Sequence, residues 1–281
     1  TPSKTDSMEY IQIHTLGNSL NFGTATFESH LRASCASHTR GLWGGGRNNS
    51  GTYQNTIDYV TIQSTGNGIE FGDLTHPKST YGGGLSSSTR GIWAGGYSNV
   101  SPDTGGIKTI DYVEIATTGD ALSFGELDVD IYNHAGTSSP IKGFFCGGSP
   151  VNEGIRKITI ASKGNSVNTG ELNAVANSST ASSNSTRAVL FGGQNPTNIN
   201  TMEYFDTSSD GNTIISGELT EAKALGASVS SQTRGVLLSG RNPSNVNNIE
   251  YINFSTLGNA IDFGDLSIAR QKFQGCSDSH G

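Results

Sequence analysis

The stretch TRGLWGGGRNN, residues 39–49, recurs along the chain in altered form. Each copy places a basic residue before a small one, then apolar residues, and four of the five copies close on Gly-Gly. Such glycines suit either a loop that cradles a phosphate or a repeated structural module. The other copies read TRGIWAGG from Thr89, IKGFFCGG from Ile141, TRAVLFGG from Thr186 and TRGVLLSG from Thr233.

A second phrase follows each copy and sets the length of the repeat. It reads NTIDYVTIQSTGNGIEFGDL from Asn55, and related phrases begin at Asp6, Lys108, Ile155, Asn200 and Asn247. Its turn pair, Gly-Asn or Gly-Asp, begins at Gly17, Gly66, Gly119, Gly164, Gly211 and Gly258, so the steps are 49, 53, 45, 47 and 47 residues. A period of about 40–50 residues with several short strands is typical of a β-propeller blade.

Each repeat divides into four short strands, which predicts an all-β fold: a six-bladed β-propeller of four-stranded blades. The first strand is rich in Ser, Gly and Ala and suits the crowded ring axis. The second is the apolar Arg-Gly phrase, and it suits the packed layer between blades. The third alternates apolar and polar residues, and with the fourth it suits the rim.

The sequence supplies only three of the four strands for the sixth blade. Only five copies of the Arg-Gly phrase exist, whereas the other strands occur six times. We expect a single domain spanning residues 1–281, with the sixth blade built from residues 6–25 and 268–281. Pairing of the N- and C-terminal strands would then close the ring. Either this blade lacks one strand or the chain was trimmed from a longer protein, and both alternatives stay open.

Composition argues against several classes of function. The net charge is −7, from 17 basic and 24 acidic residues, and no basic run occurs, so we expect no nucleic-acid partner. No apolar stretch approaches about 18 residues, so we expect no membrane insertion. Three cysteines do not suggest a disulfide framework, and no residue set resembles a metal site. We expect no cofactor.

The repeat resembles the kelch class of β-propeller, because an apolar strand ends in Gly-Gly and an aromatic-bearing strand follows. It departs from the kelch pattern in that Trp43 and Trp93 lie inside the Gly-Gly strand. The wording TRG.W.GG…NTIDYVTI.STGN…FGDLT is similar to kelch-like repeats in virion and tail-fibre proteins of tailed bacteriophages, especially of marine cyanophages. This likeness covers nearly the whole chain. It implies a virion location and a structural, tail-fibre, decoration or host-attachment role.

The glycine pairs and the repeated basic residues favour structural roles. No helix follows the glycines, so a phosphate loop is disfavoured and strand exits with unusual backbone angles are expected. A basic residue at one frame position in every blade predicts a repeated ion pair with the acid of the fourth strand. An anion-binding ring at the channel is the alternative. The predicted pairs join Arg40, Arg90, Lys142, Arg187 and Arg234 to the acids Asp73, Glu126, Glu171, Glu218 and Asp265.

Other residues raise sharper hypotheses that we weigh against structural ones. Paired carboxylates would suit a glycosidase, but the acids before tyrosine, Asp58, Asp111, Glu203 and Glu250, are spread one per blade as rim residues would be. We therefore predict no catalytic residues and no enzymatic activity. Cys35 and Cys276, followed by His38 and His280, could form a metal site, but small buried thiols are favoured.

Two sets of connections vary from blade to blade and should emerge on one face of the ring. They are rich in Asn, Ser and Tyr, which suit hydrogen bonding and stacking on sugars or protein epitopes. We expect this loop face to bind a host-surface glycan or protein, or another virion protein, and an oligomer is possible. A carbohydrate-active enzyme or lectin and a cellular kelch-type interaction scaffold are the alternatives. The candidate binding residues are Asn48, Tyr53, Tyr97, Asp103, Asn152, Asn195, Asn198, Asn242 and Asn245.

Overall fold

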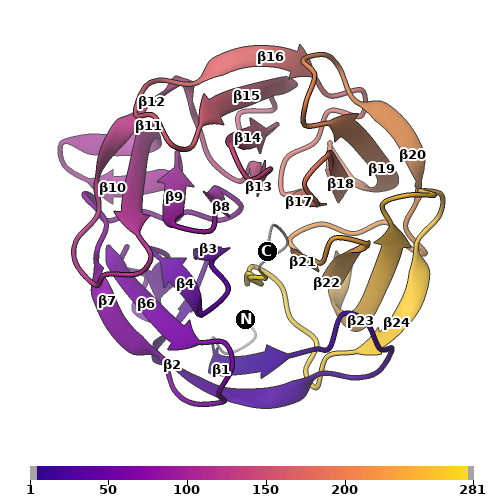
Figure 1. Ribbon diagram of the computed structural model, residues 1–281, viewed down its shortest axis with the longest axis horizontal. Coiled ribbons are helices and arrows are strands. Elements are labelled where there is room, and N and C mark those ends of the chain that lie inside the picture. The colour runs from indigo at the N-terminus through magenta and orange to yellow at the C-terminus, as the bar shows by residue number, and fades with distance from the viewer. Residues whose placement is uncertain (1–4, 278–281) are drawn as a thin grey trace.

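Six antiparallel β-sheets are arranged as the blades of a ring (Figure 1). The computed structural model describes residues 5–277, apart from the side chain of Asp103. Within these residues no helix occurs that could cross a membrane. The six-bladed, all-β prediction is confirmed.

Five blades are complete and repeat one order of strands from the axis outward. Blade 1 holds β3 (Ala33–Ala36), β4 (Arg40–Gly44), β6 (Thr56–Thr61) and β7 (Ile69–Asp73). Blade 2 holds β8 (Gly84–Ser86), β9 (Arg90–Ala94), β11 (Asp103–Glu114) and β12 (Leu122–Ile131), with β10 (Tyr97–Val100) as a hairpin extension of β11. Blade 3 holds β13 (Ala135–Ser138), β14 (Lys142–Cys146), β15 (Gly154–Thr159) and β16 (Val167–Glu171).

Blade 4 holds β17 (Thr180–Ser183), β18 (Arg187–Gln194), β19 (Asn198–Asp206) and β20 (Ile214–Glu218). Blade 5 holds β21 (Ala227–Ser230), β22 (Arg234–Asn242), β23 (Ser244–Asn253) and β24 (Ile261–Asp265). Blade 6 contains β1 (Thr5–Tyr10) and β2 (Leu20–His30), and the end of β2 pairs with β5 (Arg47–Asn48) from a loop of blade 1.

The small inner strands surround the axis as predicted, and their hydroxyl groups join one blade to the next. Ser138 donates to the carbonyl of Ser86 in the preceding blade at 2.8 Å. Ser230 donates in the same way to Ser183 at 2.9 Å. Serine is abundant in these strands because its short side chain fits the crowded axis and still reaches the neighbouring backbone.

The small residue after each Arg is explained by the same crowding. A Cβ atom added at Gly91 would lie 2.4 Å from the Sγ atom of Cys35 in the preceding blade. One added at Gly41 would lie 2.6 Å from the Sγ atom of Cys276. A side chain from the inner strand of one blade therefore fills the space that a larger residue would need in the next.

The glycine pairs are strand exits in blades 1 to 3, as the sequence predicted, whereas in blade 4 Gly192 and Gly193 lie inside β18 at a register shift with β19. Gly45 and Gly46 have φ angles of 69° and 101°, and the pairs in blades 2 to 4 repeat these left-handed conformations. Space is short as well, since a Cβ atom at Gly45 would lie 2.6 Å from the carbonyl oxygen of Lys78. No phosphate loop is needed to account for them.

At the rim, the Gly-Asn turn of each blade binds the fourth strand of the preceding one. Between blades 6 and 1, the Gly66 amide donates to the Phe22 carbonyl at 2.9 Å, and the Thr24 amide donates to Oδ1 of Asn67 at 3.1 Å. Between blades 5 and 6, the same contact joins Gly17 to Phe263. All six junctions have this contact, so the rim is continuous around the ring.

This rim contact gives a matched pair of stability predictions. Gly23→Ala should lower the free energy of unfolding by about 1–3 kcal/mol, because its Cβ would lie 2.1 Å from the Gly66 carbonyl oxygen. Gly66→Ala, on the other side of the same contact, meets nothing within 4 Å and should change stability by less than about 0.5 kcal/mol. Urea denaturation of both variants measures the difference, and equal values would contradict the steric explanation.

In blade 6, the C-terminal segment, residues 268–277, approaches the inner position after β24. Ser34 donates to the Gly275 carbonyl at 2.6 Å, and the Ser230 amide donates to Oγ of Ser277 at 2.8 Å. This segment forms no strand, and the position of a second strand between it and β1 is vacant within residues 5–277. The two ends of the described chain therefore meet in one incomplete blade.

Candidate functional site

The two variable sets of connections lie together, as predicted, and form one loop face. Isolated bridges join a fourth-to-first connection to a second-to-third connection in four blades. Ser79 bridges Tyr97, and Tyr132 bridges Ser149; Asn177–Gln194 and Ala224–Arg241 repeat the pattern. The pairing of β2 with β5, which places His30 opposite Arg47, makes the equivalent contact between blades 6 and 1.

Three tyrosines from neighbouring blades gather on this face, and we call them the tyrosine cluster. The ring centroids of Tyr53 and Tyr97 are 6.0 Å apart, and those of Tyr97 and Tyr132 are 5.2 Å apart. All three side chains are half-buried. Two of them are predicted binding residues, and Tyr132 was missed although it lies in a variable connection. Its bridge to blade 3 places it beside Tyr97.

Positive charge gathers next to the tyrosine cluster. The Arg47 guanidinium lies 5.4 Å from the centroid of the Tyr53 ring. Burial lowers the pKa of Lys272, and the nearby charges of Arg241 and Arg47 lower it further. Burial also raises the pKa of Tyr53, so its hydroxyl stays protonated and can donate a hydrogen bond at neutral pH. This acidic protein therefore presents aromatic rings and cations together on its loop face.

The predicted asparagines mostly stabilise the loops themselves. Oδ1 of Asn48 accepts from the Thr52 amide at 2.9 Å, and Oδ1 of Asn152 accepts from the Gly154 amide at 2.8 Å. The Nδ2 groups of Asn195 and Asn198 donate to the carbonyl oxygens of Val175 and Arg241, and that of Asn242 donates to Oε2 of Glu221. Asn245 faces Arg241 in the β22–β23 hairpin, and the Asp103 side chain lies outside the described part of the chain.

The predicted pairing of each Arg with the acid of the fourth strand is corrected by the strand register. Arg40 pairs with Thr61 at one end of β6, whereas Asp73 pairs with Thr56 at its other end. The two side chains therefore lie at opposite ends of the blade. Glu126 instead binds Lys108 at 3.0 Å. In residues 5–277, no ion pair joins the predicted arginines to Asp73, Glu126, Glu171, Glu218 or Asp265.

The arginines hold the following blade instead. Nη1 of Arg40 donates to the Ile115 carbonyl at 2.8 Å, and the guanidinium covers the Tyr59 ring at 4.8 Å. The same two contacts recur in blades 2, 4 and 5. Arg90 donates to the Ile160 carbonyl and covers Tyr112, Arg187 donates to the Phe254 carbonyl and covers Tyr204, and Arg234 donates to the Ile13 carbonyl and covers Tyr251. The small central cavity, about 80 Å³, has no arginine in its described lining, so these side chains form no ring at the channel.

The acids that precede tyrosine are buried, which corrects their expected place at the rim. Asp58 and Asp111 are each 1% exposed. Arg32 binds Asp58 at 2.6 Å, and Lys78 binds Asp111 at 2.9 Å, each cation coming from the connection that enters the blade. Charges in such a dry site must be paired, and these contacts join the connection to the third strand.

We call this contact, between the third-strand residue before tyrosine and the connection that enters the blade, a node, and it recurs in the other blades with variations. Lys223 binds Glu250 at 2.8 Å, and Arg270 binds Glu9. Blade 3 reverses the signs, because Arg156 stands in the acid's position and binds Asp128 at 2.5 Å. In blade 4 the backbone amides of Asn173 and Ala174 donate to Glu203. Each of these carboxylates is occupied by partners of its own blade or of the connection that enters it, one per blade, which does not suit a glycosidase pair.

The cysteines remain free thiols. Cys35 is buried, and burial raises the pKa of Cys276 to about 12, so both are protonated at neutral pH. In the part of the chain that the structure describes, no group of three or more His, Cys, Asp or Glu side chains could hold a metal ion. His280, a member of the considered metal site, lies outside the described residues.

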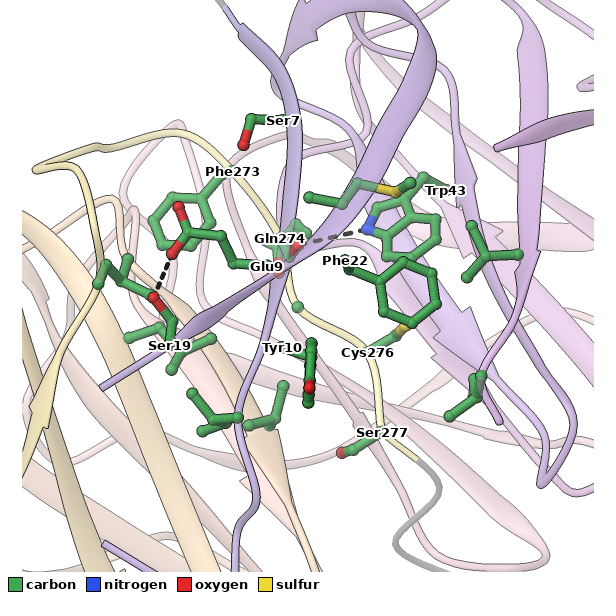
Figure 2. Close-up of a pocket in the computed structure, with 18 of the residues that line it drawn as sticks. Ser7, Glu9, Tyr10, Ser19, Phe22, Trp43, Phe273, Gln274, Cys276 and Ser277 are labelled. Carbon is green, nitrogen blue, oxygen red and sulfur yellow. Dashed lines mark hydrogen bonds between the residues drawn. The ribbon is translucent and has the colours of Figure 1, made fainter. Parts of the chain in front are cut away.

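A cavity of about 770 Å³ lies in blade 6 (Figure 2). β1 and the C-terminal segment line it, with Trp43 from blade 1 and Val229 and Leu238 from blade 5. Nε1 of Trp43 donates to the Gln274 carbonyl at 3.3 Å across one wall. The sequence already indicated this place through the missing copy of the Arg-Gly phrase.

No known family model matches the chain, and no curated protein is significantly similar to it.

Proposed function

We propose that the protein is a non-enzymatic adhesion module of a phage virion that binds an acidic host-surface glycan through its loop face. The observation that carries this proposal is the tyrosine cluster with Arg47 against Tyr53, and with Lys272 near both Arg47 and Arg241. The resemblance of the repeat to phage virion and tail-fibre proteins supports the virion location.

The chemistry of the cluster fits a sugar that carries a carboxylate. Half-buried tyrosine rings offer flat apolar faces on which a sugar ring stacks, and their hydroxyls donate to its oxygens. Arg47 and its neighbouring cations pair with the carboxylate, and a guanidinium binds a carboxylate with two parallel hydrogen bonds. The loops are held in place by their own asparagines, so little conformational entropy is lost on binding.

Tyr97→Ala should weaken binding to an acidic host polysaccharide by about tenfold or more, because Tyr97 contacts both other rings. Isothermal titration calorimetry with the purified polysaccharide measures this. Ile141→Ala is the matched control, since Ile141 is 64% exposed and lies in the opposite type of connection, between β13 and β14. Its affinity should stay unchanged.

The test separates the parts of the proposal. Affinity that survives Tyr97→Ala and Arg47→Ala together would place the ligand away from the tyrosine cluster. Affinity that is equal for neutral and acidic polysaccharides would contradict the role of the cations. New reducing ends after incubation with the polysaccharide would show a carbohydrate-active enzyme and overturn the non-enzymatic part. Immunogold labelling of phage particles tests the virion location.

A further inference from the structure

The cavity in blade 6 lies where the second strand of a complete blade would lie. In each complete blade the second strand lies between the inner and third strands, with antiparallel hydrogen bonds to both. In blade 6 the corresponding neighbours are the C-terminal segment and β1, and both line the cavity of about 770 Å³.

The free edge of β1 shows the effect of the missing neighbour. β1 ends at Tyr10, whereas the other five third strands continue to the counterparts of Gln12: Thr61, Glu114, Thr159, Asp206 and Asn253. Met8 and Ile11 are half-buried. Their counterparts are fully buried in every complete blade: Ile57 and Val60, Ile110 and Val113, Ile155 and Ile158, Met202 and Phe205, Ile249 and Ile252.

A tyrosine ring and a backbone carbonyl that bind an arginine in other blades also lack an arginine at this position. In four blades the Arg of the second strand covers a tyrosine of its own blade and donates to a carbonyl of the next blade. By the same register, an Arg in blade 6 would cover Tyr10 and donate to the Ile62 carbonyl. Within residues 5–277 no Arg or Lys makes either contact, and Ile62 lines the cavity.

We propose that this cavity binds one extended strand that carries the Arg-Gly phrase. The strand adds to the free edge of β1, as in β-strand addition to exposed sheet edges. From the register of β4 in blade 1, its Arg faces Gln12, its third residue faces Tyr10 and its fifth faces Met8.

The lining specifies the side chains at two positions of this strand. The second must be small, glycine or alanine, because Val229 occupies the place that Cys35 holds against Gly91 in blade 2. The fifth must be small, because Trp43 corresponds to Trp93, whose indole would lie 2.9 Å from a Cβ atom at Gly44. The phrase of blade 2, with Ala94 at the fifth position, meets both requirements, whereas that of blade 5 has Leu238 there.

A second copy of this chain does not fit the requirement. Each of its five Arg-Gly strands is hydrogen-bonded on both sides within its own blade. Donating one would unpair a complete blade. The occupant is therefore an Arg-Gly strand other than these five paired ones.

The test adds a synthetic peptide of residues 88–97, STRGIWAGGY, to the protein and measures binding by fluorescence polarisation with a labelled peptide. We expect saturable binding of one peptide per protein. Hydrogen exchange should show new protection in residues 8–13, along the free edge of β1, and unchanged protection in β24. Gly91→Val in the peptide should weaken binding at least about tenfold through its clash with Val229.

A double-mutant cycle tests the register. Arg90→Ala in the peptide should weaken binding about two- to fivefold to the unaltered protein, and much less to the Tyr10→Ala protein, because the ring that the Arg covers is then absent. Absence of binding, equal binding of the Gly91→Val peptide, or protection elsewhere overturns the proposal. A dimer of the protein that excludes the peptide also overturns it, because the second copy is then the occupant.

Discussion

Lys78→Met is expected to lower the free energy of unfolding by about 3–5 kcal/mol, the cost of leaving one member of a buried ion pair without its partner. Lys78 is 0% exposed and its Nζ atom lies 2.9 Å from Oδ2 of Asp111, which is 1% exposed. Methionine is similar in volume but one atom shorter, and it removes the charge together with the hydrogen bond that Nζ donates to Oγ1 of Thr109 at 3.2 Å. Equilibrium unfolding in urea at pH 7 measures the loss.

The double variant Lys78→Met/Asp111→Leu is the decisive comparison. With both charges removed, no uncompensated charge stays buried, so at least half of the lost stability should return. Thr75 loses its acceptor in the double variant, because its hydroxyl binds Oδ1 of Asp111 at 2.5 Å, so recovery should be incomplete. A double variant that is less stable than Lys78→Met would contradict the assignment of the loss to an unpaired carboxylate.

Acid should destabilise the fold through His134, by up to about 4 kcal/mol between pH 6.5 and pH 3. Burial lowers the pKa of His134 to about 3, and the charges of Arg156 and Lys78 contribute. In this window the unfolded chain binds a proton that the folded protein excludes, so stability falls as the pH falls. The ring is 0% exposed and packs against Phe145.

His134→Asn should flatten the dependence of stability on pH in this window, even if the smaller side chain lowers stability at pH 7. His14→Asn is the control, because His14 is exposed and should leave the profile unchanged. Urea denaturation at pH 4, 5, 6 and 7 provides both profiles. A slope that is the same in His134→Asn and the unaltered protein would assign the acid sensitivity to carboxylates such as Glu9, whose pKa is lowered.

The repeat predicted the fold because it encodes contacts that occur once per blade. The Gly-Asn turn and the small inner strand have the roles that their residue types indicated, and so does the glycine pair in blades 1 to 3. The buried acids were missed for a physical reason. In strand IDYVTI, Ile57 and Asp58 are both buried, since neighbouring blades cover both faces of the sheet. Alternation of apolar and polar residues therefore does not mark a solvent-facing side here.

The candidate site could be predicted in part. The sequence placed Tyr53 and Tyr97 on the loop face but could not show that Tyr132 joins them, because this depends on the bridge between connections of different blades. The asparagines were harder to interpret. An amide suits a ligand and a loop backbone equally well, and only the hydrogen bonds of Asn48 and Asn152 decide between the two.

The reversed pair in blade 3 has a consequence for how such a repeat can diverge. Asp128 stands at the position of Thr75, and Ile131 stands at that of Lys78. Without Asp128 the charge of Arg156 would be buried unpaired, so these two residues must have changed together or through a neutral state. Blade 4 displays such a state, because Glu203 is held by backbone amides and Asn173 stands where blade 3 has Asp128. Natural variation at these two positions should therefore be correlated within a blade and independent between blades.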